Sequence, residues 1–281
     1  MKITRQAIVA TGMICLCLAL ARGQARSATP YKLIGHRGGV VEDKFPDNCS
    51  AALQAAVARG YWMIETDIRE TKDGILIMHH DPDFDAYFHD PRKVIDLTWD
   101  EIRSLHSDLA DQHPWRFEDV VEAAHDAGLR LMLDSKDPHT AGFCKKVEAI
   151  LKQYDMLDRC YIIGTADALK YFTGKAPVGL KFKSLKPRVE ADPAAGKCYF
   201  LFDEGTMTTD MVHWAQARDI KVVPSVNVYH YYDPKTMAGK SRKELKPVIF
   251  AAARRDIEKF KALGVTEFQI DSEFDRWLKA P

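Results

Sequence analysis

Short runs of apolar residues alternate along the chain with longer stretches in which apolar residues recur every three or four positions. The short runs have the length of buried β-strands, and the longer stretches have the period of amphipathic helices. Strands that alternate with helices predict a parallel sheet covered by helices. The predicted strands are Lys32–Gly35, Met63–Ile68, Leu131–Leu133, Cys160–Ile163, Val178–Phe182, Tyr199–Phe202, Val222–Val226 and Glu267–Ile270.

Eight strands of this kind in roughly 250 residues favour a single (β/α)8 barrel, the TIM barrel, formed by residues 30–281. A doubly wound open sheet is the alternative architecture for the same alternation of strands and helices. No G-x-G-x-x-G motif follows the first strand, which weakens a dinucleotide-binding version of that alternative.

Local signals indicate where several helices begin and end. Asn48 is expected to cap the helix that continues to Arg59, and Gly60 is expected to end it. The segment Thr98-Trp99-Asp100-Glu101 has the spacing of a capping box. The link 184–197, between the fifth and sixth strands, lacks an evident helix.

A β-hairpin is predicted directly after the second barrel strand. Asp73-Gly74 separates two apolar runs, and this dipeptide is typical of a two-residue hairpin turn. Such a turn places Asp67 opposite His80, whereas a three-residue turn shifts the register by one residue. In either register the hairpin brings His80 into the neighbourhood of Asp67.

Composition and charge narrow the range of partners. The chain of 281 residues is 46% apolar and 28% charged, and its 40 basic residues balance its 40 acidic ones. A net charge of zero gives no reason to expect nucleic acid or an anionic membrane surface as partner. Any recognition of phosphate must therefore be local.

The first 25 residues have the pattern of a signal peptide. Lys2 and Arg5 precede the apolar stretch 7–21, and small residues follow it. This stretch is shorter than the ~20 apolar residues that span a bilayer, so we expect cleavage of 1–25 and no stable membrane anchor. The mature protein would be exported to the periplasm or the exterior. There its four remaining cysteines are expected either in disulfides or as buried thiols: Cys49, Cys144, Cys160 and Cys198.

Acidic residues gather where predicted strands end. Glu65 and Asp67 are two positions apart on one strand, so their side chains share a face. Asp134 ends the third strand, and a barrel brings it to the same rim. Neighbouring carboxylates repel one another unless a cation or a proton intervenes, and carboxylate oxygens select Mg²⁺ or Ca²⁺ over zinc. The three residues therefore predict a site for one divalent cation.

Two histidines and two basic residues accompany these acids. His36 ends the first strand and His80 follows the hairpin, and paired imidazoles can divide the roles of general acid and general base. Arg37 can bind phosphate oxygens through two parallel hydrogen bonds. Lys136 can stabilise the charge of a phosphoryl transition state. The pattern leaves open which histidine is the acid.

Taken together, these segments resemble the glycerophosphodiester phosphodiesterase family. The motifs that match in order and spacing are His36-Arg37-Gly38, Pro46-Asp47-Asn48, Glu65-x-Asp67, Thr71-Lys72-Asp73-Gly74 and His80-Asp81. The resemblance implies a TIM barrel that hydrolyses a small-molecule glycerophosphodiester to glycerol 3-phosphate and an alcohol. It also implies a role for each candidate residue: metal binding for Glu65, Asp67 and Asp134, catalysis for His36 and His80, and phosphate binding for Arg37 and Lys136.

The chain departs from the usual pattern of that family in several places. Asp47 and Asp134 stand where the family usually has glutamate, so each carboxylate is one methylene shorter. Pro224-Ser225-Val226-Asn227 replaces the usual Trp-Thr-Val-Asn, which changes a wall of the substrate pocket. Aromatic residues of the neighbouring loops either enclose a bulky alcohol or pack the loops: Phe84, Tyr87, Phe88 and the segment Tyr229–Tyr232.

Two other functions are compatible with the same residues. The first is a phospholipase C- or D-like enzyme that acts on a phospholipid head group, for which the aromatic loops would supply an apolar rim. The second is a barrel that binds a phosphorylated ligand without turnover, which the shorter acidic residues Asp47 and Asp134 would favour.

Overall fold

The computed structural model describes residues 31–42, 44–232, 237–239 and 241–279. The predicted signal segment, 1–25, lies outside the described residues. Within these ranges, no helix has both the length and the apolar character that crossing a bilayer requires.

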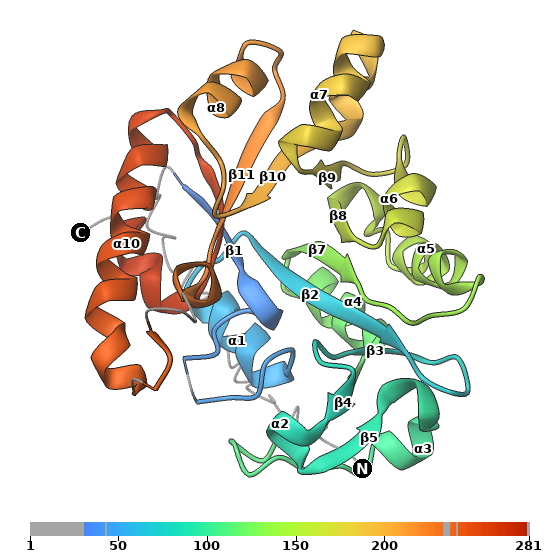
Figure 1. The fold of residues 1–281 in the computed structure, drawn as a ribbon. Helices are drawn as coiled ribbons and strands as arrows, with labels where there is room; N and C mark the ends of the chain where they lie inside the picture. The colour runs from blue at the N-terminus through green and yellow to red at the C-terminus, as the bar shows by residue number, and fades with distance from the viewer. Residues whose placement is uncertain (1–30, 43, 233–236, 240, 280–281) are drawn as a thin grey trace, which may run out of the picture.

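Eight parallel strands close into a barrel (Figure 1). Each strand pairs with its neighbour in the ring, and the first strand pairs with both the last and the second, which closes it. The strands are β1 (Lys32–Gly35), β2 (Met63–Glu70), β7 (Arg130–Ser135), β8 (Cys160–Gly164), β9 (Val178–Leu180), β10 (Tyr199–Glu204), β11 (Lys221–Val226) and β12 (Glu267–Ile270). Every predicted strand is present, which confirms the barrel and excludes the open sheet.

Helices surround the barrel, and the long helix α10 packs beside β11 (Figure 1). The α-helices outside the insertion are α1 (Ser50–Ala58), α4 (Phe117–Asp126), α5 (Phe143–Gln153), α6 (Ala166–Phe172), α7 (Phe182–Ala191), α8 (Thr209–Gln216) and α10 (Arg242–Ala262). Short 3-10 helices follow or precede several strands: η1 (His36–Gly38), η3 (Leu157–Arg159), η4 (Pro193–Cys198), η5 (Val228–Tyr231) and η6 (Ser272–Trp277).

The alternation of side chains along the strands produces two apolar regions. One apolar cluster joins strand residues such as Leu33 and Ile64 to the surrounding helices. The buried members of a second cluster, among them Ile34, Met63 and Met132, all come from strands and fill the barrel interior. Side chains two and four positions after Met63 therefore point into the barrel as well, toward its carboxyl end.

An insertion lies between β2 and β7. It contains β3 (Leu76–Met78), β4 (Asp83–Phe84), α2 (Asp85–Phe88), β5 (Asp90–Lys93), η2 (Val94–Asp96), α3 (Trp99–Ile102) and β6 (Trp115–Arg116). β3 pairs antiparallel with the end of β2, so the predicted hairpin is present. Thr98 and Glu101 form the predicted capping box at the start of α3.

The register of the hairpin differs from the two-residue prediction. The His79 N–H donates to the Asp67 carbonyl oxygen at 3.0 Å, so His79, and not His80, lies opposite Asp67. The turn has three residues between Thr71 and Ile75, which share a hydrogen bond of 2.9 Å. Gly74 supplies the left-handed residue that such a turn requires, with φ +80°. His80 still follows directly after this strand pair.

Two further local predictions were wrong. Cys49, not Asn48, precedes the first turn of α1, because Asn48 has a left-handed backbone and its side chain bonds Asp67 instead. The link that lacked a helical pattern contains most of α7, which continues through Pro187. Leu185 and Val189, one turn apart, are both buried, and this packing compensates for the hydrogen bond that proline removes.

The cysteines of the described chain are free thiols. Cys49, Cys144 and Cys160 are buried, and Cys198 is half-buried. Of the two alternatives that the sequence left open, the structure therefore selects thiols over disulfides. Burial raises the pKa of each of the three buried thiols, as expected of inert core cysteines.

Candidate active site

The loop after β1 fixes Arg37 in an unusual conformation. Its backbone is left-handed, with φ 52° and ψ 51°, which costs a non-glycine residue about 1–2 kcal/mol. Two hydrogen bonds stabilise it: the Arg37 N–H donates to Glu65 Oε2 at 2.8 Å, and the Arg37 carbonyl accepts from the Asn48 N–H at 2.8 Å. Gly39 allows the close approach of α1, because a Cβ at this position would lie 2.5 Å from the Ala52 carbonyl oxygen.

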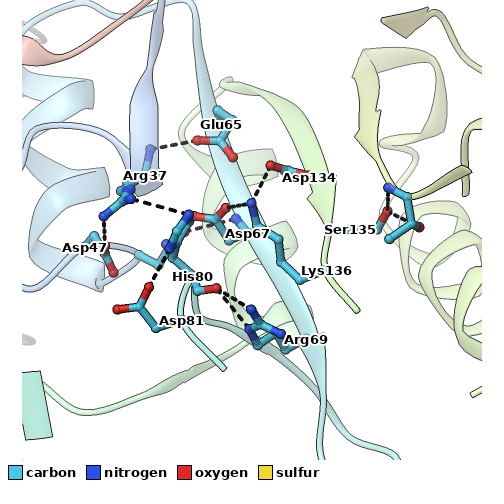
Figure 2. A network of polar contacts seen from close by, with 12 residues as sticks. Arg37, Asp47, Glu65, Asp67, Arg69, His80, Asp81, Asp134, Ser135 and Lys136 are labelled. Carbon is cyan, nitrogen blue, oxygen red and sulfur yellow. Dashed lines mark hydrogen bonds and ion pairs between the residues drawn. The ribbon is translucent and has the colours of Figure 1, made fainter. Parts of the chain in front are cut away.

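Three carboxylates converge at the carboxyl ends of β2 and β7 (Figure 2). One oxygen each from Glu65, Asp67 and Asp134 lies within 4.8 Å of the others. Asp67 and Asp134 are register partners on neighbouring strands, and Glu65 shares the interior face of β2 with Asp67. Asn48 orients Asp67 with two hydrogen bonds, Nδ2 to Asp67 Oδ2 at 2.7 Å and the Asp67 N–H to Oδ1 at 3.1 Å.

Burial gives this acidic cluster an unusual electrostatic state. Glu65 and Asp67 are each 1% exposed. Burial and the charge of Asp67 raise the pKa of Glu65 to about 8. Burial also acts to raise the pKa of Asp67, but Lys136, His80 and Asn48 together outweigh burial and lower the pKa to about 2. A proton on Glu65 thus relieves the repulsion, and a divalent cation can take its place, because an all-oxygen donor set fits a hard cation.

Lys136 contacts two of the three carboxylates. Its Nζ lies 2.9 Å from Asp67 Oδ1 and 2.6 Å from Asp134 Oδ2 (Figure 2). Burial alone would lower the pKa of Lys136, but the two carboxylates outweigh burial and raise it above its ordinary value. The ammonium group therefore stays charged near neutral pH and neutralises one of the negative charges of the cluster.

Among the described residues, one other group has the composition of a metal site. His106, Asp111 and His113 bring ligand atoms within 4.8 Å of one another, and all three are exposed. They belong to the insertion, between α3 and β6. Two imidazoles with one carboxylate suit zinc or copper better than Mg²⁺ or Ca²⁺. The group therefore differs in chemistry from the acids of the barrel.

His36 is tied to a residue at the far end of the chain. Its Nδ1 lies 2.7 Å from Oδ1 of Asp271, which directly follows β12, and Asp271 Oδ2 accepts from the Val228 N–H at 2.7 Å. Burial acts to lower the pKa of His36, but Asp271 outweighs burial and raises the pKa to about 9. His36 is therefore a cation at neutral pH and can donate a proton.

His80 has a carboxylate partner of its own. Its Nδ1 lies 2.7 Å from Asp81 Oδ1, and Arg37 Nη2 lies 3.3 Å from its Nε2. Because a guanidinium group only donates, Nε2 is the acceptor in this contact and the ring proton is on Nδ1. Arg69 fixes the backbone here, since its Nε and Nη2 both donate to the His80 carbonyl, at 3.0 and 2.6 Å (Figure 2). His80 can therefore accept a proton at Nε2.

A cavity of about 340 Å³ opens beside Arg37. Arg37 Nη1 donates to Asp47 Oδ2 at 3.0 Å and to the Tyr229 hydroxyl at 3.3 Å, and the guanidinium lies 4.7 Å from the centre of the Tyr229 ring. Arg37 Nε is buried and, within the described chain, has no hydrogen-bond partner. An anionic ligand can accept a hydrogen bond from the Arg37 guanidinium. Residues lining the cavity include His36, Arg37, Asp47, Tyr87, Tyr229 and Asp271.

A profile described as the Glycerophosphoryl diester phosphodiesterase family matches residues 36–260, which is most of the chain. The chain belongs to this family. The matched region contains His36, the whole acidic cluster and Lys136, whereas Asp271 lies beyond it. Membership agrees with the resemblance found from the sequence motifs.

Curated relatives match part of the chain. It is 29% identical over 136 residues to human glycerophosphodiester phosphodiesterase 1, an alignment that covers 46% of this chain and 39% of the human protein. It is 28% identical over 139 residues to a glycerophosphodiester phosphodiesterase of Caldanaerobacter subterraneus, covering 46% of this chain and 56% of that protein. The aligned regions thus span less than two thirds of the length of these relatives.

Solved structures share the fold over almost the whole barrel. A phosphodiesterase of Oleispira antarctica, solved in complex with the product sn-glycerol-3-phosphate, has a TM-score of 0.66 at 16% identity and covers 88% of this chain and 96% of its own. A glycerophosphodiester phosphodiesterase of Agrobacterium tumefaciens has a TM-score of 0.65 at 17% identity, covering 87% and 97%. At such low identity the similarity establishes the fold.

The structure brings all seven candidate residues to one end of the barrel, and it adds contacts that the sequence did not indicate. Asp271 beside His36, Asn48 beside Asp67 and Arg69 beside the His80 carbonyl were not predicted as site residues. Asp271 carries one detectable signal, because it directly follows the last strand as Asp134 ends the third. Arg69 lies within β2, and no comparable feature of the sequence marks it as a site residue.

Some aromatic residues of the loops line the cavity, whereas others pack the loops, so both predicted roles occur. Tyr87 and Tyr229 line the cavity. Phe84 is buried and stacks on the His79 ring with 4.5 Å between ring centres, and Phe88 packs against both of them. The tyrosines are therefore available to a ligand, whereas the phenylalanines pack the insertion.

Proposed function

We propose that this chain is an enzyme that hydrolyses glycerophosphodiesters to glycerol 3-phosphate and an alcohol with the help of one divalent cation, Ca²⁺ or Mg²⁺. The observation that carries the proposal is the convergence of a buried carboxylate cluster, two carboxylate-bound histidines and an arginine whose buried N–H has no partner among the described residues. Family membership points to the same substrate class, as does the product named for the Oleispira structure.

Arg37 is the residue that we propose to bind the phosphodiester. Its Nε is buried without a partner in the described chain, and the residue lines a cavity of about 340 Å³. Asp47 and Tyr229 hold the guanidinium in place from two sides. A cation held by Glu65, Asp67 and Asp134 would neutralise charge on the phosphate oxygens.

His36 is the proposed general acid. Departure of the alcohol breaks a P–O bond and leaves the electron pair on the alcohol oxygen, which needs a proton. His36 carries one at neutral pH because Asp271 raises its pKa to about 9. Its contact with Asp271 uses Nδ1, and His36 lines the cavity, so Nε2–H is the group proposed to donate to a ligand. A positioned acid of this kind contributes about 10²–10⁴-fold in rate.

His80 is the proposed general base. The nucleophile, water or a substrate hydroxyl, loses a proton as its oxygen bonds to phosphorus. The Arg37 contact identifies His80 Nε2 as an acceptor, and Asp81 stabilises the imidazolium that forms when this nitrogen takes up the proton. The two histidines thus complete one proton exchange for each diester cleaved.

Activity measurements on the purified protein test the proposal. We expect turnover of at least one member of a panel of glycerophosphodiesters, loss of turnover with a chelator, and recovery with Ca²⁺ or Mg²⁺. His36→Ala and His80→Ala should each lower kcat by at least about 10²-fold without unfolding the protein, as circular dichroism would check. Near-wild-type turnover in either variant would remove that histidine from the mechanism, and binding without turnover across the panel would refute the enzyme.

We also propose that the protein is exported to the periplasm or the exterior. The support is the signal-peptide pattern of residues 1–25, with its charged start, apolar stretch and small residues. Fractionation of expressing cells, followed by N-terminal sequencing of the recovered protein, tests it. Recovery of uncleaved protein from the cytoplasm alone would contradict the proposal.

A further inference from the structure

A second, apolar cleft lies beside the charged cavity. Its volume is about 460 Å³, and its apolar lining comes from η5, the residue after it and one face of α10: Val228, Tyr229, Tyr232, Leu245, Ile249 and Phe250. Its charged lining residues, Lys246 and Glu273, pair with each other at 2.9 Å. The cleft therefore presents hydrocarbon to a ligand and little uncompensated charge.

Apolar surface in this cleft is open to solvent. Tyr229 is 60% exposed and Tyr232 is 42% exposed, although Leu245 and Ile249 beneath them are buried. Aromatic and aliphatic surface of this kind is costly to leave in water, and contiguous patches usually mark binding sites. The occupant that the surface fits is a hydrocarbon chain.

The cleft and the charged cavity adjoin each other. Val228, Tyr229 and Glu273 line both of them. The Arg37 guanidinium, which we propose to bind the phosphodiester, lies over the Tyr229 ring, 4.7 Å from the ring centre. A ligand whose phosphodiester lies on Arg37 can therefore continue past Tyr229 into the apolar cleft. Such a ligand is amphiphilic, with a charged end and an alkyl chain.

We propose that the cleft binds the acyl chain of a monoacyl glycerophosphodiester, a lysophospholipid present as a monomer. The inference rests on the proposed function, because the reaction is the same. Water supplies oxygen to phosphorus, the P–O bond to the head-group alcohol breaks, and that alcohol takes up a proton. The products are a monoacyl glycerol phosphate and the free alcohol, and the acyl ester stays intact.

The expected effect is on KM more than on kcat. The chain lies away from the reacting phosphorus, so it contributes equally to binding of the substrate and of the transition state. Full burial of one methylene is worth about fourfold in affinity. Burial equivalent to two or three methylenes would lower KM by about 30-fold.

The test compares two substrates that share a head group. kcat and KM are measured for glycerophosphocholine and for dodecanoyl-lysophosphatidylcholine below its critical micelle concentration. We expect kcat/KM to favour the acylated substrate by at least about 30-fold. Tyr232→Asp, which changes an exposed side chain, should lower that preference by at least about tenfold. Ile249→Asp should do the same if thermal unfolding shows it to be folded.

Val248→Asp is the matched control. Val248 is 55% exposed on the same helix, next to Ile249 but outside the cleft lining. It also replaces an apolar residue by aspartate, and the preference between the two substrates should stay at the wild-type value. Equal loss in this variant would mean that added charge on α10, and not the cleft, sets the preference, which would overturn the inference.

Other outcomes separate this inference from the proposed function. Turnover of glycerophosphocholine with no preference for the acylated substrate overturns the inference alone. No turnover of either substrate, or of the wider panel, refutes the proposed function and the inference with it. Faster hydrolysis of phospholipid in vesicles than of the monomeric lysophospholipid would mean that the cleft binds a membrane surface. A dimer that dissociates in Tyr232→Asp would mean that the cleft binds a second copy of the chain. Either result overturns the inference.

Discussion

The two histidines of the site are bound to carboxylates through the same ring atom but have different surroundings at the other one. His36 Nδ1 contacts Asp271, and its buried ring keeps a proton because that carboxylate raises its pKa to about 9. His80 Nδ1 contacts Asp81, while its Nε2 accepts from Arg37. Identical side chains thus have different surroundings: a carboxylate raises the pKa of His36, whereas Nε2 of His80 faces the guanidinium of Arg37.

Replacement of Asp271 tests this difference through the pH dependence of kcat/KM. In the wild type, activity should fall as pH rises through about 9, because His36 loses the proton that the leaving alcohol needs. Asp271→Asn removes the charge that raises this pKa, so the alkaline limb should move down toward the ordinary histidine value of about 6.5. At pH 8 the variant should lose at least about tenfold more activity than at pH 6.

Asp81→Asn is the matched control for this profile. It removes the carboxylate from the other histidine, so it should lower turnover without moving the alkaline limb. An alkaline limb that stays near 9 in Asp271→Asn would show that another group provides it, and the assignment of His36 as the acid would fail.

Sequence spacing indicated only some of these residues. Glu65, Asp67 and Asp134 stand at strand ends, where barrel geometry gathers side chains, so a linear pattern could indicate them. Asp271 is 235 positions away from His36, and nothing in spacing assigns one partner to the other. Which carboxylate binds which histidine depends on the three-dimensional closure of the barrel.

The hairpin after β2 shows a similar limit for a single element. An Asp-Gly pair fits both a two-residue and a three-residue turn, and the two differ by one residue in register. Contacts from elsewhere accompany the longer turn: Asp73 accepts from the Trp99 N–H at 3.0 Å, and Lys146 Nζ donates to the Gly74 carbonyl at 2.8 Å. The existence of the hairpin was local information, but its register was not.

Helix α7 gives the opposite case, in which local signals pointed away from a helix. Pro187 and a polar sequence weaken the helical pattern of this link. The barrel nevertheless offers an apolar surface between β9 and β10, and Leu185 and Val189 bury their side chains against it. Burial of two such side chains is worth about 3–6 kcal/mol, comparable to the cost of about 3 kcal/mol for the proline.

The two ends of the barrel differ in how completely their buried carboxylates are paired with cationic groups. At the amino end, Glu267 is buried but pairs with Lys32 at 3.1 Å and accepts from the Tyr161 hydroxyl at 2.8 Å. At the carboxyl end, the acidic cluster of Glu65, Asp67 and Asp134 shares one lysine, Lys136. The excess negative charge at that end destabilises the fold unless a cation or a proton compensates it.

Addition of a cation should therefore stabilise the folded protein independently of catalysis. A ligand present at 100 times its Kd contributes about 2.7 kcal/mol, which raises Tm by about 5–10 °C in a domain of this size.

Glu65→Gln removes one anionic donor, so the rise in Tm caused by the same concentration of Ca²⁺ or Mg²⁺ should be smaller than in the wild type. Its metal-free Tm should stay close to that of the wild type at neutral pH, because Glu65 is already protonated below its pKa of about 8 and the amide of Gln is neutral as well. Asp111→Asn, in the exposed histidine-containing group, should keep the full gain. Differential scanning calorimetry with and without cation measures all three proteins, and an undiminished gain in Glu65→Gln would place the cation elsewhere.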